Sequence, residues 1–173
     1  MSALFLKVIL GSVLMKGLYM QNNKRNKLIF FWGFATLGCM ILIFYMSHKP
    51  AAESGEMSGF IVEWLLRHGI GKKAAGSLDF IVRKCAHMSE YLALTVCESF
   101  LLINIRKDYS AGTRIFAAIL AALYAVSDEI HQLFVPGRAG KTMDVFIDSV
   151  GITLAFLIIT LYFKCRKHST YSV

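Results

Sequence analysis

The sequence lacks the short motifs that mark common metal-binding and catalytic sites. Its four cysteines share no C-x-x-C or metal-like spacing, it contains no H-E-x-x-H pair, and none of its serines lies in a recognised nucleophile motif. We therefore predict neither a metal site nor another cofactor. We interpret the cysteines as small hydrophobic core residues; they are Cys39, Cys85, Cys97 and Cys165.

A continuous basic stripe is also absent. The formal net charge of +8 would by itself be compatible with a nucleic-acid binder. However, the lysines and arginines occur in short clusters that flank apolar runs, which is typical of the signals that orient helices in a membrane. We therefore predict that nucleic acid is not a partner.

Hydrophobic residues are abundant. They make up 56% of the 173 residues, and the mean hydropathy is +0.55, far above what a soluble domain of this size needs to fill one core. The uncharged stretch 28–46 is long enough to cross a hydrocarbon layer of roughly 30 Å, at about 1.5 Å per helical residue. We predict an all-α, polytopic integral membrane bundle with four core helices, at residues 28–46, 78–105, 115–135 and 143–163.

The basic clusters predict how these helices are oriented. They lie at residues 24–27, 106–114 and 164–167, before the first span, between the second and third, and after the fourth. All three fit one side of the membrane, which the positive-inside rule assigns to the cytoplasm, so the C-terminus is predicted to be cytoplasmic. The predicted regions are an N-terminal apolar stretch with a basic linker (1–27), the transmembrane domain (28–163) and a basic cytoplasmic tail (164–173).

Two further stretches have weaker helical patterns. Residues 3–19 are apolar, but Lys7 and Lys16 point to opposite sides of a helix, so we leave this stretch as an optional extra helix and Met20 as a candidate start of a four-span chain. Residues 59–70 predict an amphipathic helix that lies on the outer leaflet. Its residues at helical spacing are Ile61, Trp64, Leu65 and His68.

Ionisable side chains occupy one face of the second span. In RKCAHMSEY, His87, Glu90 and Tyr91 are spaced i, i+3 and i+4, which places them on the same side of a helix. Arg83 and Lys84 lie on that side one turn earlier. A base, an acid and two cations therefore share one helix face.

A second polar face lies near the end of the third span, in SDEIHQLFVPGR. Asp128, His131 and Gln132 again have the spacing i, i+3 and i+4. Glu129 is adjacent to Asp128, and Arg138 follows the predicted helix end. This face also combines acids with a histidine and a cation.

The start of the fourth span carries a third face, formed by Asp144 and Asp148 one turn apart. Counting residues from the outer ends places all three faces at a similar depth. Carboxylates at the bilayer centre cost about 2.5 to 3.5 kcal/mol each on insertion scales, so these acids should face inward and pair with cations. The natural partners are Arg83, Lys84 and Arg138.

These faces are compatible with three kinds of function. An enzyme would use His87 or Glu90 for proton transfer, and Asp128 would orient His131. A structural protein would use the same charges as an ion-pair network that holds the helices in register. A transporter would relay protons through Glu98, although the chain has no inverted repeat.

The polar segments KCAHMSEY and SDEIHQLFVPGRAGKTMDVFIDSVG resemble the VanZ-like family of bacterial membrane proteins, and FYMSHKP is similar to a short Ser- and Pro-containing segment of relatives. The resemblance covers about residues 28–160 and implies a four-helix domain in the bacterial cytoplasmic membrane. Asp148 stands where relatives often have Asn, and residues 1–27 have no clear counterpart. The matched positions are Lys84, His87, Glu90, Tyr91, Asp128, Glu129, His131, Gln132, Arg138 and Asp144.

The resemblance also implies a function, because the family's namesake is associated with resistance to teicoplanin, a lipoglycopeptide that targets cell-wall precursors outside the membrane. We expect an outward-facing pocket that binds or acts on an envelope lipid, a lipid-linked precursor or the antibiotic. The candidate catalytic residues are His87, Glu90, Asp128 and His131. The candidate ligand-binding residues are Arg83, Lys84, Tyr91, Glu129, Gln132, Arg138, Asp144 and Asp148.

Overall fold

The computed structural model describes residues 2–68, 75–138 and 140–170, and the regular elements among them are all helices. These helices are α1 (Ser2–His48), α2 (Ala51–Arg67), α3 (Ala75–Arg106), α4 (Ala111–Gln132) and α5 (Thr142–Thr170). Four segments in the described part are long and apolar enough to cross a membrane: Asn22–His48, Ser77–Arg106, Ala111–Gln132 and Thr142–Arg166. The predicted all-α bundle with four spans is confirmed.

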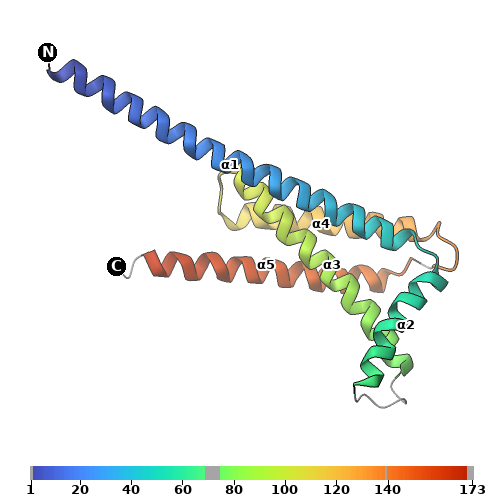
Figure 1. The fold of residues 1–173 in the computed structure, drawn as a ribbon. Helices are drawn as coiled ribbons and strands as arrows, with labels where there is room; N and C mark the ends of the chain where they lie inside the picture. Colours follow the sequence, from blue (N-terminus) through green and yellow to red (C-terminus); the bar gives the residue numbers. More distant parts are fainter. Residues whose placement is uncertain (1, 69–74, 139, 171–173) are drawn as a thin grey trace.

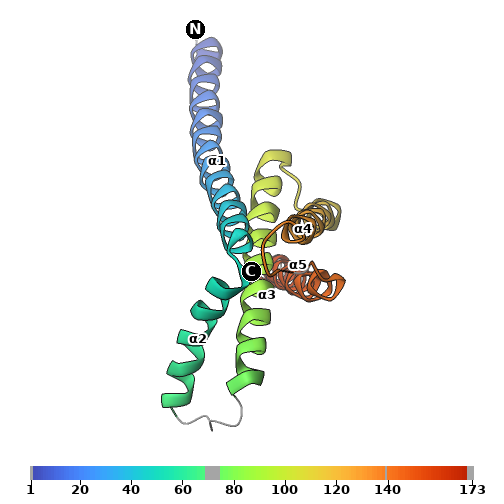
Figure 2. The same ribbon diagram turned by 90° about the vertical axis from the view of Figure 1, so that its right-hand side faces the viewer.

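Helix α3 is the centre of the bundle and packs against all four other helices (Figure 1). The α3–α4 connection and the C-terminal end of α5 lie at the same end of the bundle as the N-terminal half of α1, so the three basic clusters share one end. The opposite end carries α2 and the α4–α5 connection, and we call it the α2 end. Figure 2 shows that α2 and the first half of α3 extend together from the rest of the bundle.

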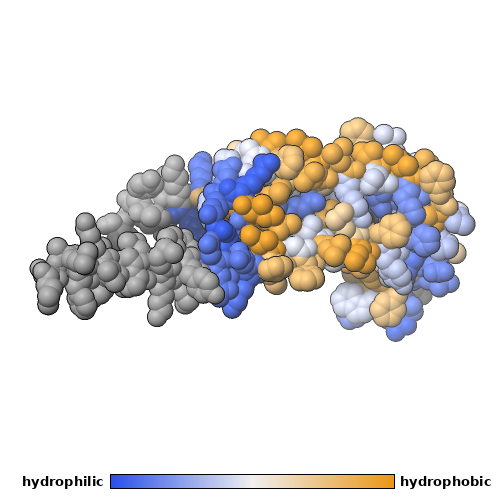
Figure 3. Space-filling model, turned by 90° about the horizontal axis from the view of Figure 1, so that it is seen from above, coloured by the Kyte–Doolittle hydropathy of each residue, from blue (hydrophilic) through white to orange (hydrophobic). Residues whose placement is uncertain are grey.

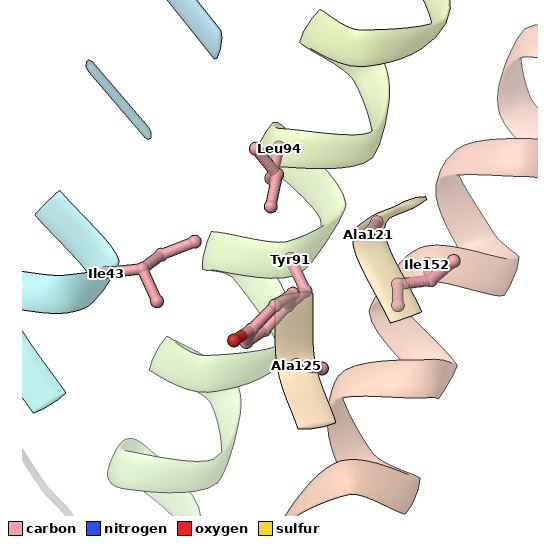
Figure 4. Packing of buried hydrophobic residues seen from close by; sticks show 6 residues of the cluster. All are labelled: Ile43, Tyr91, Leu94, Ala121, Ala125 and Ile152. Atoms are coloured by element: carbon pink, nitrogen blue, oxygen red, sulfur yellow. The ribbon is translucent and has the colours of Figure 1, made fainter. Parts of the chain in front are cut away.

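The core lies where α1, α3, α4 and α5 meet (Figure 4). Tyr91 and Leu94 of α3 cluster with two of the fully buried alanines of α4, whose small side chains let helix backbones approach closely, as is usual between membrane helices. Large apolar side chains cover much of the outside, and Figure 3 shows a largely hydrophobic surface next to a hydrophilic zone. The central cluster consists of Ile43, Tyr91, Leu94, Ala121, Ala125 and Ile152.

Helices α3 and α5 come into backbone contact at Gly151. A Cβ atom at this position would lie 2.1 Å from the carbonyl oxygen of Met88, far inside van der Waals contact. Only glycine permits this approach, because it has no side chain. The contact fixes how α5 is placed against the polar face of α3, since Met88 follows His87 directly.

Several helix ends differ from the predicted ones. The third span ends at Gln132 and not at Val135, because the amides of residues 133–135 bond to carbonyls three residues back and form turns. The chain then turns at Gly137, whose φ of 72° is accessible to glycine at little cost. The first 20 described residues do not form a separate helix, since α1 runs without a break from Ser2 to His48.

Helix α2 begins earlier than the amphipathic helix predicted for residues 59–70, directly after Pro50, and Ile70 lies outside the described residues. The side that packs on the bundle and the apolar face predicted to lie on the outer leaflet are two different stripes of this helix. Val62 is buried, whereas Ile61 and Trp64 of the predicted apolar face are exposed. The α2 helix therefore rests on α3 through a neighbouring stripe of its surface.

The short α3–α4 connection has its own polar contacts. Lys107 ends α3 in the left-handed region, with φ 56°, and Asp108 then accepts hydrogen bonds from the Ser110 hydroxyl, the Thr113 hydroxyl and the Ser110 amide. These bonds, led by that of the Ser110 hydroxyl, lower the pKa of Asp108 to about 2. Asp108 thus satisfies backbone and side-chain donors at the start of α4.

The cysteines do not all occupy the core. Cys39 and Cys97 are half-buried between α1 and α3, with their Sγ atoms 4.0 Å apart. Cys85 and Cys165 are exposed, so the prediction that they are core residues is wrong. Both side chains lie on helix faces that no other described helix covers.

Candidate functional site

The polar face of α3 lines a cavity of about 230 Å³ at the α2 end of the bundle. Residues spaced three and four apart bring this face together, as helical geometry requires. The α4–α5 connection forms the opposite wall. The lining residues are Phe80, Arg83, Lys84, His87, Gln132, Gly137, Arg138, Lys141 and Asp144.

Two contacts join this face of α3 to the first turns of α5. The Lys84 ammonium forms an ion pair with Asp144, and both side chains are largely buried. One turn deeper, His87 Nδ1 lies 3.9 Å from Asp148 Oδ1. Asp148 is completely buried, and neither of its carboxylate oxygens has a hydrogen-bond partner in the described part of the chain. His87 is therefore backed by a buried carboxyl group on the side away from the cavity.

Arg138 has a structural role that the sequence did not indicate. Its Nε and Nη2 each donate a hydrogen bond of 3.1 Å, to the carbonyl oxygens of Lys49 and Met46 respectively. These carbonyls lie at the C-terminal end of α1, where a cation is favoured by the helix dipole. Burial lowers the pKa of Arg138 from its usual high value, but a guanidinium keeps its charge in proteins.

A second cavity of about 120 Å³ adjoins the first and shares Arg83, His87 and Arg138 with it. It extends between α2 and α3 toward the end of α1, and most of its other lining is apolar. Glu90 reaches this cavity and does not line the first. The remaining lining residues are Met46, Ser54, Ser58, Ile61, Val82 and Ala86.

A family model described as VanZ/LLP1 matches residues 31–163, which is most of the chain and includes part or all of each of the four spans. The chain belongs to the VanZ/LLP1 family. No curated protein and no solved structure matches it significantly. The family match confirms the resemblance carried by the polar segments of α3, α4 and α5.

Within this VanZ/LLP1 domain, Asp128 does not contact His131 as the enzyme hypothesis expected. Its Oδ2 accepts hydrogen bonds from Ser47 Oγ at 2.7 Å and from Gln132 Nε2 at 3.2 Å, and all three side chains are buried. The Gln132 amide also donates to Ser47 Oγ at 3.2 Å. This triad joins α1 to α4 and does not expose the Asp128 carboxylate to either cavity.

His131 lies on a different side of the bundle from His87. Its Nε2 is 3.4 Å from His48 Nδ1, and its ring stacks on Phe44. It lines a separate, open cavity of about 460 Å³ together with Glu53 and other residues around the end of α1. The structure thus brings His87 and Glu90 together at the second cavity and places His131 at a separate one.

Two other predicted ligand-binding residues point into the protein. Glu129 is buried, and its Oε2 accepts a hydrogen bond of 2.8 Å from the backbone amide of Lys141, which fixes the connection to α5. Tyr91 is completely buried in the core, and its hydroxyl has no hydrogen-bond partner among the described residues. Neither side chain lines either cavity of the VanZ/LLP1 site.

Several residues of the site were missed from the sequence, and Lys141 in the wall of the first cavity is one of them. Ser47 is the partner of Asp128, and Ser58 donates a hydrogen bond to Asp79, which also forms an ion pair with Arg83. The spacing i, i+4 of Asp79 and Arg83 was a visible signal for that pair. Among the described residues, no three His, Cys, Asp or Glu side chains come together as a candidate metal site.

Proposed function

We propose that this VanZ/LLP1 protein binds an anionic group of a cell-envelope molecule in the cavity at the α2 end. The observation that carries the proposal is the composition of the cavity wall. Four cations line it, Arg83, Lys84, Arg138 and Lys141, against one carboxylate, Asp144. The candidate ligands are an envelope lipid, a lipid-linked cell-wall precursor and a lipoglycopeptide such as teicoplanin.

The interactions that these four cations make within the protein support the binding of an anionic ligand. Lys84 and Arg83 have carboxylate partners. Arg138 instead donates to two neutral carbonyls, which use two of its five N–H donors, and Lys141 forms no ion pair within the described residues. The Lys141 ammonium, unpaired among the described residues, and the remaining N–H donors of Arg138 favour an anionic ligand, and guanidinium groups suit phosphate and carboxylate geometry.

The same geometry supports acid–base chemistry at His87. This side chain lines both cavities, and the buried Asp148 carboxyl group lies 3.9 Å from its Nδ1, close enough to act electrostatically on an imidazole that carries a proton. Glu90 lines the second cavity and is the other candidate proton carrier. In this proposal Asp148 positions His87, and the reacting group of the ligand lies at the junction of the two cavities.

The test compares teicoplanin susceptibility of cells without the gene and cells that express wild-type protein, His87→Ala or His68→Ala. His68 is the matched control, because it is exposed directly after the end of α2 and lines neither cavity. We expect His87→Ala to lose protection while its level in the membrane stays normal, and His68→Ala to protect like the wild type. Full protection by His87→Ala would contradict the proposal.

The contacts of Arg138 and Asp128 with α1 favour a second candidate function, a purely structural charge network. Exchanging the charges of one ion pair separates the two functions. The single variants Lys84→Asp and Asp144→Lys should accumulate poorly, and the double variant should restore the protein level. If the double variant restores protection as well, the pair is structural; restored protein without protection supports a role of Lys84 in binding.

A further inference from the structure

The two cavities at the α2 end differ in chemistry but meet at the same three residues. Four cations and one carboxylate line the first. Apart from the shared residues, the second is lined by four apolar side chains and by Ser54, Ser58 and Glu90; the apolar ones are Met46, Ile61, Val82 and Ala86. We propose that the ligand is a membrane lipid with a phosphate monoester head group, held with its phosphate at the junction and its hydrocarbon chain in the second cavity. This inference rests on the proposed anion-binding function and specifies its ligand.

The donors at the junction suit a phosphate that carries two charges. Arg83 and Arg138 both line the junction, and Arg138 has N–H donors left over after its two bonds to α1. Lys84 and Lys141 lie farther along the wall of the first cavity. A phosphate monoester carries about −1.5 to −2 charges near neutral pH, whereas the phosphodiester of an ordinary phospholipid carries one, so the monoester gains more from several cations.

The second cavity suits a hydrocarbon chain because α2 and α3, which form its walls, also expose large apolar side chains. Phe60 and Ile61 on α2 and Phe80 and Ile81 on α3 are exposed in the structure, and in a membrane they face lipid. A chain that enters between α2 and α3 therefore meets exposed apolar side chains on both helices before it reaches Val82. The lipid can move sideways from the bilayer, so its chain need not cross water.

One hydrogen bond joins α2 to α3 beside this cavity. Ser58 of α2 donates a hydrogen bond to Asp79, and the same carboxylate holds Arg83 at the junction. Asp79 thus keeps the Arg83 guanidinium next to the proposed phosphate position while α2 covers the chain. The head group stays accessible through the first cavity, whose opposite wall is the α4–α5 connection.

The test uses the full-length protein purified in a neutral maltoside detergent, so that no phospholipid competes. The probes are hexadecyl phosphate, hexadecylphosphocholine and inorganic phosphate, and the measurement is the dissociation constant of each. We expect hexadecyl phosphate to bind at least about tenfold more tightly than hexadecylphosphocholine, and about a hundredfold more tightly than inorganic phosphate, since head group and chain both contribute.

Three variants locate the binding. Lys141→Gln should weaken binding of hexadecyl phosphate by about five- to tenfold through loss of one charge, whereas Arg67→Gln, an exposed cation that lines neither cavity, should leave it unchanged. Ile61→Trp fills the second cavity from a half-exposed position, so it should weaken the alkyl phosphate and leave inorganic phosphate unaffected.

Each contrary result has a distinct meaning. Equal affinity for inorganic phosphate and hexadecyl phosphate would overturn the placement of the hydrocarbon chain in the second cavity. It would leave the proposed anion-binding function in place. Equal affinity for hexadecyl phosphate and hexadecylphosphocholine would overturn the assignment of the head group as a phosphate monoester. Unchanged binding in both Lys141→Gln and Ile61→Trp would show that the probe partitions elsewhere, which overturns the inference. If none of the three probes binds, the proposed anion-binding function fails together with the inference.

Discussion

The close contact between α3 and α5 predicts that Gly151→Ala destabilises the protein. The added Cβ would lie 2.1 Å from the Met88 carbonyl oxygen and 3.2 Å from the backbone nitrogen of Leu92. Both neighbours are backbone atoms of a helix, so neither can rotate away. The two helices must separate by roughly 1 Å to reach ordinary contact distances.

The expected cost follows from the behaviour of overpacked cores. Forcing extra carbon atoms into a well-packed interface costs about 1 to 3 kcal/mol. For a chain of this size, each kcal/mol lowers the Tm by about 2 to 4 °C, so Gly151→Ala should lower it by about 2 to 12 °C. The separation should also lengthen the 3.9 Å approach of His87 to Asp148, because these residues lie within one turn of the contact.

The assay is thermal unfolding of the purified protein in detergent, followed by size-exclusion chromatography of the heated samples. Gly38→Ala is the matched control, because a Cβ at Gly38 in α1 meets nothing within 4 Å and alanine is the better helix former. We expect no loss of Tm for the control. If the two variants melt within about 1 °C of each other, the proposed backbone contact is wrong.

Two further predictions concern polar contacts. Ser47→Ala removes a donor to the buried Asp128 carboxylate and should cost about 1 to 3 kcal/mol, seen as a lower Tm. The control Ser127→Ala, on the exposed side of α4, should melt like the wild type. Equal Tm values for the two variants would contradict the buried triad. Hydrogen bonds led by that of Ser110 lower the pKa of Asp108 to about 2, below its unfolded value of about 3.8, so their stabilisation is complete above about pH 4 and is lost as the pH falls toward 2. The Tm difference between wild type and Asp108→Asn should therefore be constant from about pH 5 to 8 and shrink below about pH 4, and a difference that persists at pH 2 would refute the assignment.

The helices and their polar faces could be predicted from the sequence, because both depend on local properties. An uncharged run such as 28–46 is long enough to span a membrane wherever its neighbours lie. Likewise, the spacing of Arg83, His87 and Glu90 places them on one side of any regular helix, and that side does line the cavities. Length, hydropathy and helical period need no knowledge of the partners.

The partners of the polar residues were decided only by the tertiary structure. The spacing of Asp128 and His131 indicated that the two residues form a pair. In the structure Asp128 instead accepts a hydrogen bond from Ser47 of α1, and His131 contacts His48 at the end of the same helix. Each residue along a helix turns the side chain by about 100°, so a small difference in helix rotation selects another neighbour. No local pattern encodes that rotation.

The position of α5 along its axis is another feature that tertiary packing decides and the sequence does not predict. The sequence by itself determined that the protein is a four-span helical bundle with acids and cations on three helix faces. Only the packing of Gly151 against the Met88 carbonyl placed Asp148 behind His87, because a contact between two backbones depends on how whole helices fit together. Residue spacing along each helix determines which ionisable groups share a face. The geometry of the site is set by contacts between residues about 60 positions apart in the chain.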